Sequence, residues 1–119
     1  MKVPILKQGS ILIASVQSEL SDLDLLQLRD ELLERVGEHR VRGVIIDVTA
    51  LDVIDSFAAR TLSNTAQMVR LRGADTVIVG IQAEVAFSMI QLGLALKDVT
   101  TALDLEEGLY ILREVARTK

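Results

Sequence analysis

The pattern of apolar and polar residues along the chain predicts strands that alternate with helices. The first two blocks are short apolar runs, residues 3–7 and 11–16, and the segment between them contains Gly9. Two strand-like runs joined by a glycine-containing turn predict an antiparallel hairpin. Pro4 in the first run cannot donate a hydrogen bond to a neighbouring strand, so we expect this run at an edge of the sheet.

A helical pattern follows the hairpin. Ser21 and Asp24 have the spacing of a capping box, in which the serine caps the first turn and the acidic side chain bonds back to the serine backbone. The apolar positions behind this start share one side of a helix; they are Leu25, Leu28, Leu32, Leu33 and Val36. We expect the helix to end between residues 37 and 42.

Two continuous apolar runs rich in β-branched residues, 43–48 and 76–80, are typical of central strands covered on both faces. Between them, Asp55 and Ser56 open a helical pattern with a small apolar inner stripe, which stops near Gly73. The remaining expected elements are a helix over 83–92, a brief last strand over 98–100, and a final helix that Asp104 caps, with Glu107 as its capping-box partner.

This alternation predicts the fold class. We expect a single α/β domain over residues 1–119, with a mixed, mostly parallel β-sheet, an antiparallel N-terminal hairpin and about four α-helices. No internal repeat, linker composition or low-complexity tract divides the chain.

The amino-acid composition argues against several classes of function. Aromatic residues make up only 3% of the chain and the formal net charge is −4, which argues against a nucleic-acid surface, because such surfaces use basic groups and stacking rings. The chain has no cysteine, so disulfides, thiolate catalysis and cysteine-based metal sites are excluded. No apolar run approaches the roughly 20 residues that span a bilayer, and no signal-peptide core follows Met1. We therefore expect a cytoplasmic protein without a nucleic-acid or membrane partner.

Asp47 ends the first buried strand, at the carboxyl edge where open α/β sheets place their sites. Such a carboxylate could accept a phosphoryl group or bind a metal. The phosphoryl-acceptor pattern also requires an acidic pair after the first strand, and residues 3–18 contain none. We favour a structural role, in which Asp47 accepts hydrogen bonds from backbone N–H groups near Thr49 or Asp55.

Ser56 lies where a helix presents free backbone N–H groups, which together with the helix dipole favour an anion. In one interpretation, Asp55 is an N-cap and Ser56 is an ordinary first-turn residue. In the other, Ser56 is a phosphorylation site, and the apolar Ile54 and Phe57 form a docking rim beside it. The residues alone leave both interpretations open, and helix caps are far commoner than phosphorylation sites.

No catalytic centre emerges from the other polar residues. His39 is the only histidine and precedes the first buried strand, whereas Ser56 follows it, so we expect the two at opposite edges of the sheet, out of reach of each other. The sequence contains no HExxH, P-loop or GxGxxG motif, and an isolated carboxylate such as Asp52 does not establish acid–base chemistry. We expect no enzyme activity, no cofactor and no metal.

The order of elements and four motifs together resemble a STAS domain, the fold of anti-sigma factor antagonists, over essentially the whole chain. The motifs are Gly43-Val44-Ile45-Ile46-Asp47-Val48, Val53-Ile54-Asp55-Ser56-Phe57, Val77-Ile78-Val79-Gly80-Ile81, and the segment from Ala86 to Gly93. Within the family, the chain most resembles the RsbS-type small subunits of the stressosome. That subgroup is matched by Val3-Pro4-Ile5-Leu6-Lys7, Ile54-Asp55-Ser56-Phe57, Gly80-Ile81-Gln82 and Thr101-Ala102-Leu103-Asp104-Leu105-Glu106. Phe57-Ala58-Ala59 stands where sporulation-type antagonists have a second serine and Gly-Leu-Gly.

The resemblance implies a non-enzymatic scaffold that sequesters a serine/threonine switch kinase of the RsbT type. It also implies a larger STAS paralogue of the RsbR type in a multi-subunit complex. Under stress the kinase would phosphorylate Ser56 and leave, and a phosphatase would reset Ser56. The implied switch loop and partner surface comprise Asp47, Thr49, Asp52, Ile54, Asp55, Phe57 and Arg60.

Other functions remain open from the sequence. The main alternative is a stand-alone anti-sigma factor antagonist that binds an anti-sigma kinase directly in a partner-switching pathway. A ligand-sensing or transport-associated STAS module and an esterase that uses Ser56 are further alternatives. A second phosphorylation site at Thr49, Thr61 or Ser88 also stays open.

Overall fold

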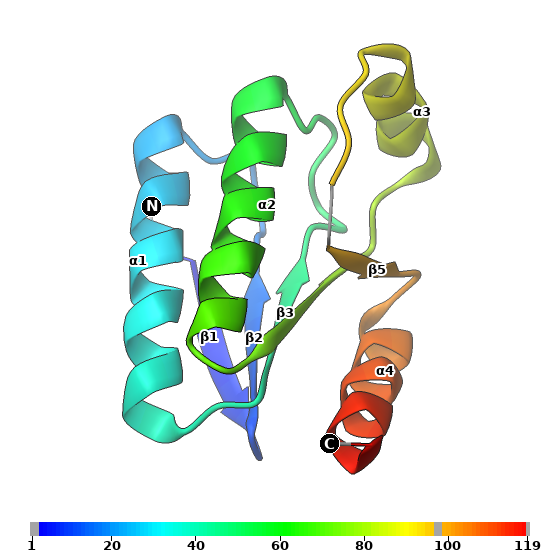
Figure 1. Cartoon of the computed structure of the whole chain (residues 1–119). Coiled ribbons are helices and arrows are strands. Elements are labelled where there is room, and N and C mark those ends of the chain that lie inside the picture. The colour runs from blue at the N-terminus through cyan, green and yellow to red at the C-terminus, as the bar shows by residue number, and fades with distance from the viewer. Residues whose placement is uncertain (1–2, 97–98, 119) are drawn as a thin grey trace.

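Strands and helices alternate along the chain as the sequence predicts (Figure 1). The computed structural model describes residues 3–96 and 99–118, apart from the side chains of His39 and Thr118. In chain order, the elements of these residues are β1 (Ile5–Gln8), β2 (Ile11–Ser15), α1 (Asp22–His39), β3 (Gly43–Asp47), α2 (Ser56–Leu71), β4 (Asp75–Val79), α3 (Ala83–Gln91), β5 (Thr100–Ala102) and α4 (Leu105–Thr118).

The strands form one sheet whose spatial order is the order of the chain, β1-β2-β3-β4-β5. β1 pairs antiparallel with β2, and the pairs that follow are parallel. The expected mixed sheet with an antiparallel N-terminal hairpin is therefore confirmed. β1 lies at an edge, as Pro4 predicts.

The last strand begins later than we predicted. We expected it over 98–100, but β5 covers Thr100–Ala102 and pairs with β4, with Val77 opposite Thr100. Asp98, the first residue of the predicted strand, lies outside the described residues. The consecutive β-branched residues Thr100 and Thr101 suit a pleated strand, which is consistent with the later position.

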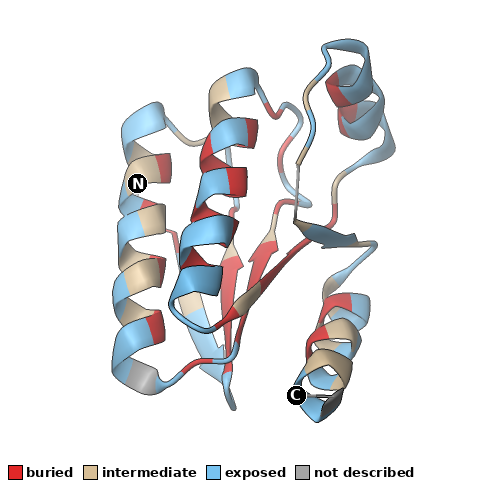
Figure 2. Ribbon diagram, viewed as in Figure 1, coloured by how far each residue is buried: buried red, intermediate tan, exposed pale blue. Residues whose placement is uncertain are grey.

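The sheet separates two apolar cores, because successive side chains of a strand point to opposite faces. On β3, Val44 and Ile46 face the core on the side of α1 and α2, and Ile45 faces the core on the side of α4. All three residues are fully buried. α1 and α2 lie side by side, and their buried residues turn towards the sheet (Figures 1 and 2). The continuous apolar run of β3 is thus covered on both faces, as predicted.

The predicted helix starts are confirmed by their hydrogen bonds. Ser21 Oγ accepts from the N–H of Asp24 at 3.1 Å, and Asp24 Oδ2 accepts from the N–H of Ser21 at 3.3 Å, which completes a capping box at α1. At α4, Asp104 Oδ1 accepts from the N–H of Glu107 at 2.9 Å, which confirms the cap. The side chain of Glu107 accepts from the N–H of Leu103 at 2.9 Å and not from that of Asp104, so the predicted partner bonds one residue earlier than in a capping box. Local side-chain chemistry therefore sets where these helices begin.

Candidate functional site in the loop that leads into α2

Asp47 organises the beginning of the loop that connects β3 to α2. Its Oδ1 accepts two hydrogen bonds from Thr49, one from the backbone N–H at 2.9 Å and one from the hydroxyl at 2.6 Å. This is the structural role that we favoured from the sequence. The bonds fix the first residues of the loop at the carboxyl edge of the sheet.

Two residues distant in sequence hold the middle of the loop. The side-chain amide of Gln82 donates to the carbonyl of Thr49 at 2.7 Å and to that of Leu51 at 3.2 Å. From the other direction, Glu19 Oε1 accepts from the N–H of Asp52 at 3.0 Å. Segments that follow β2 and β4 therefore both hold the loop between β3 and α2, so its path does not depend on local bonds alone.

Gly80 lets this loop pass close to the end of β4. Its φ is +84°, a left-handed backbone conformation that favours glycine. A Cβ at this position would overlap Oγ1 of Thr49 and would lie 3.2 Å from Oδ1 of Asp47. The observed contact between Thr49 and Asp47 therefore requires a glycine at the end of the neighbouring strand.

The sequence did not predict that Glu19 and Gln82 bind this loop, or that Gly80 makes room for it. Glu19 and Gln82 each lie 33 positions from a loop residue that they bind, so no local pattern reveals the contacts. Topology offers the signal that could have found them. All three residues follow a strand, and the carboxyl ends of neighbouring parallel strands meet at the same edge of a sheet.

Ser56 is the first residue of α2, and its side chain is exposed. Asp55 precedes it as the N-cap: its Oδ1 accepts from the N–H of Ala58 at 2.8 Å, and its carbonyl accepts from the N–H of Ala59 at 2.9 Å. The predicted capping role of Asp55 is confirmed. The cap fixes the first turn and leaves the Ser56 hydroxyl on the surface, where another protein can reach it.

Ile54 is not part of the surface, contrary to our expectation of a docking rim. It is 4% exposed and belongs to the core on the side of α1 and α2. The adjacent Val53 is 61% exposed. The loop turns one of these two apolar side chains inward, and burial of isoleucine removes the larger apolar surface from water. The apolar contacts available beside Ser56 are therefore Val53 and the half-buried Phe57.

The other residues of the expected partner surface lie on the loop before Ser56 and on α2. Asp52 and Asp55 are exposed on the loop, and Arg60 is exposed on the second turn of α2. Asp47 is half-buried and supports the loop through Thr49. The start of α2 and the loop before it thus expose a serine, two acidic residues and one arginine, and one of the acidic residues, Asp55, also caps the helix.

The other hydroxyls that we considered as phosphorylation sites differ in access. Thr61 is 8% exposed, so a kinase could not reach its hydroxyl without opening α2. Thr49 is exposed, but its hydroxyl donates to Asp47. Ser88 is exposed on α3. Thr49 and Ser88 are therefore the accessible candidates, and Ser88 lies on a different element from Ser56.

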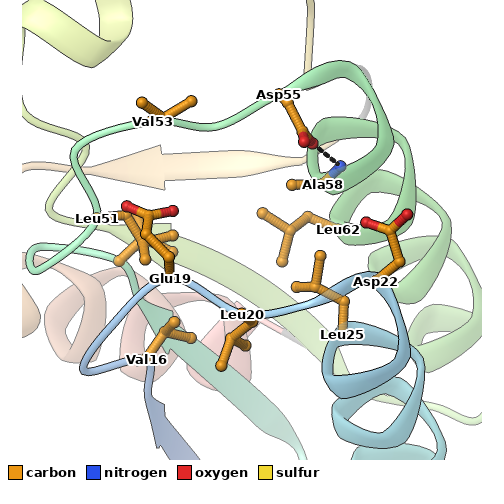
Figure 3. A pocket seen from close by; sticks show the side chains of 11 residues that line it. Val16, Glu19, Leu20, Asp22, Leu25, Leu51, Val53, Asp55, Ala58 and Leu62 are labelled. Carbon is orange, nitrogen blue, oxygen red and sulfur yellow. Dashed lines mark hydrogen bonds between the residues drawn. The ribbon is translucent and has the colours of Figure 1, made fainter.

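A small groove lies beside the loop, between the first turns of α1 and α2 (Figure 3). Its lining is mostly apolar and includes Val16, Leu51 and Leu62, with the carboxylates of Glu19 and Asp55 among these side chains. Its cavity volume is about 50 Å³. A cavity of this size holds a few waters or the end of one aliphatic side chain, and a nucleotide would not fit.

No arrangement for metal or triad chemistry occurs in residues 3–96 and 99–118. Within them, no three His, Cys, Asp or Glu residues are grouped so that they could hold a metal ion. His39 ends α1, which leads into the start of β3, whereas Ser56 follows the end of β3. The described helices also lack the combination of length and apolar character that a bilayer crossing requires.

The fold and the loop motif place the chain in a known class of regulatory domain. A family model of the STAS domain matches residues 2–108. The chain therefore belongs to the STAS domain family.

Two solved structures and one curated relative connect this chain with the stressosome. A serine-to-glutamate variant of RsbS from Moorella thermoacetica is 35% identical, with a TM-score of 0.82 over 97% of each chain. The second is a chain of the stressosome, a signal integration and transduction hub. It is 33% identical to this chain, with a TM-score of 0.76 over 96% of this chain and 99% of that one. The RsbT co-antagonist protein RsbRA of Bacillus subtilis (strain 168) is 32% identical over 93 residues.

The match to RsbRA covers 78% of this chain and 34% of the relative, so the chain spans about a third of the length of that protein. The likeness to RsbS, in contrast, extends over nearly all of both chains. Together these likenesses support a regulatory role of the STAS type for this protein.

Proposed function

We propose that this protein is a non-enzymatic small STAS subunit of a stressosome, which sequesters a serine/threonine kinase of the RsbT type and releases it after phosphorylation of Ser56. The observation that carries the proposal is the exposed serine at the first residue of α2. The loop before it is held by hydrogen bonds with Asp47, Glu19 and Gln82. The chain is 35% identical to RsbS over 97% of its length. A complex that is controlled in this way by an ATP-dependent kinase would act in the cytoplasm.

The mechanism depends on charge. The kinase transfers the terminal phosphoryl group of ATP to Ser56 Oγ, the hydroxyl proton is released, and ADP leaves. The phosphate adds about −1.5 to −2 charges beside Asp55, the adjacent residue, on a loop that also exposes Asp52. A partner that covers this region would have to bury a dianion among like charges, and such juxtaposition costs several kcal/mol. The kinase therefore leaves, and a phosphatase that removes the phosphate restores binding.

The first test compares the affinity of the RsbT-type kinase for single variants. Ser56→Ala should bind like the unmodified protein, because it adds no charge, and it should not be phosphorylated. Ser56→Asp should bind roughly tenfold more weakly, and protein phosphorylated on Ser56 roughly a hundredfold more weakly, which corresponds to about 2.7 kcal/mol. Isothermal titration calorimetry measures all three dissociation constants.

The matched control is Ser88→Asp, which adds the same charge to an exposed serine on another helix. This variant should bind the kinase like the unmodified protein. Equal binding by Ser56→Asp and Ser88→Asp would show that the charge at the start of α2 does not control the kinase.

The larger assembly separates this proposal from a stand-alone anti-sigma factor antagonist. We propose that an RsbR-type paralogue co-assembles with this chain through a domain of the same fold, since a segment of RsbRA is 32% identical to this chain over 93 residues. Size-exclusion chromatography with light scattering should show a megadalton-scale complex when the two proteins are mixed. If they elute separately while the chain still binds an anti-sigma kinase, the stand-alone alternative is correct.

A further inference from the structure

Ser56 and Arg60 line one open hollow on the surface of α2. The hollow runs along the helix past Ser56, Arg60 and Asn64, and its far wall is formed by Leu94 and the adjacent residues that follow α3. Ser56, Arg60 and Asn64 are all exposed. It lies on the side of the first turn away from the groove of Figure 3, which is lined by Asp55 and Ala58 and does not include Ser56.

Helix geometry directs the Arg60 side chain towards Ser56. Residues four positions apart are neighbours on a helix surface, with Cβ atoms about 5–6 Å apart. Helical side chains also lean towards the N-terminus, so that of Arg60 extends back over the turn that carries Ser56. An anion followed four residues later by a cation is the more favourable order for such a pair. Arg60 can therefore reach a phosphate on Ser56 without a change in the backbone.

Arg60 is available for this role. The ion pairs found in the described part of the chain use other arginines, Arg29, Arg35 and Arg117. In the first turn of α2, Asp55 already accepts the hydrogen bonds of the Ala58 and Ala59 N–H groups. A phosphate on Ser56 therefore has fewer backbone donors to use, and an arginine provides several N–H donors in a planar fork that suits phosphate oxygens.

We propose that Arg60 is the intramolecular receptor for the phosphate on Ser56, and that it holds the phosphate in the hollow beside Asn64. The inference rests on the proposed function only in that Ser56 must carry the modification. The consequence is that phosphorylation changes two groups at once: it adds a dianion and it draws Arg60 from the exposed surface onto that dianion. A partner that contacted Arg60 would then lose this contact as well as meeting the new charge.

The test is a ³¹P NMR titration of protein in which phosphoserine is encoded genetically at position 56, so that no kinase is needed. The second pKa of a phosphoserine is about 6. A nearby guanidinium favours the dianion, so the pKa should be lower in the native sequence than in Arg60→Gln. An exposed ion pair between residues four positions apart on a helix is expected to lower the phosphate pKa by about 0.3. Arg60→Lys should retain part of the shift, because it keeps the charge and loses the fork.

Arg70→Gln is the matched control, because Arg70 is exposed on the same helix and carries the same charge far from Ser56. It should leave the phosphate pKa unchanged, since charges beyond a Debye length are screened. If Arg60→Gln leaves the pKa unchanged, or if Arg60→Gln and Arg70→Gln raise it equally, the proposal is wrong. The calorimetric test of Ser56 is independent of this titration, so either hypothesis can fail while the other stands.

Discussion

The substitution Ile54→Ala is expected to lower the free energy of unfolding by about 3 kcal/mol. Truncation of a buried isoleucine to alanine loses apolar burial and leaves a cavity, and such changes typically cost 2–5 kcal/mol. Ile54 is 4% exposed and packs in the core shared by α1, α2 and the sheet. Urea unfolding followed by circular dichroism measures the change.

Val53→Ala is the matched control, because Val53 is the adjacent apolar residue and is 61% exposed. Its effect should stay within about 0.5 kcal/mol, as for surface substitutions in general. The pair of variants thus separates the buried residue of the loop from the exposed one. Equal losses of stability in both variants would contradict the assignment of Ile54 to the core and Val53 to the surface.

Gly80→Ala is expected to destabilise the protein by about 2–3 kcal/mol. A left-handed conformation costs an L-residue with a side chain about 1–2 kcal/mol. The new Cβ would also overlap Thr49 Oγ1. Relief of the overlap moves the hydroxyl away from Asp47, and a hydrogen bond of this kind contributes about 1 kcal/mol. Urea unfolding again provides the measurement.

Two further variants separate the conformational cost from the overlap. Gly93 also has a positive φ, +70°, but a Cβ there would meet nothing within 4 Å. Gly93→Ala should therefore show only the conformational cost, about 1–2 kcal/mol. In a Thr49→Ala background, Gly80→Ala should cost less than in the native sequence, because the overlapping oxygen is gone. Additive effects of the two changes would show that the contact between Gly80 and Thr49 is not the cause.

Most of the fold could be predicted because its signals are local. The apolar run of residues 43–48 and the capping box at Ser21 each specify an element through neighbouring residues. β5 was placed too early, since a strand of three residues at the edge of a sheet has too little pattern to fix its register. Its position is set by pairing with β4, which is a long-range contact.

The candidate site was predictable only in part, for the same physical reason. The hydrogen bond that the Thr49 N–H donates to Asp47 spans two positions and follows from the known tendency of aspartate to bind nearby backbone groups. Whether Val53 or Ile54 points inward depends on how the loop meets the core, and adjacent apolar residues without periodicity do not reveal it. The hydrogen bonds that Glu19 and Gln82 make with the loop form only where the ends of β2, β3 and β4 meet, so they are long-range contacts.

The order of strands in the sheet also determines when the loop before Ser56 can be held in place during synthesis. Chains emerge from the ribosome N-terminus first, and here each new strand pairs with the one made just before it. Ser56 itself emerges early, yet the loop before it needs Gly80 and Gln82, which follow β4. A nascent chain that ends within α2 therefore carries the serine without its fixed loop. Under the proposed function, a kinase that recognises this fixed loop would therefore act on chains that have completed β4.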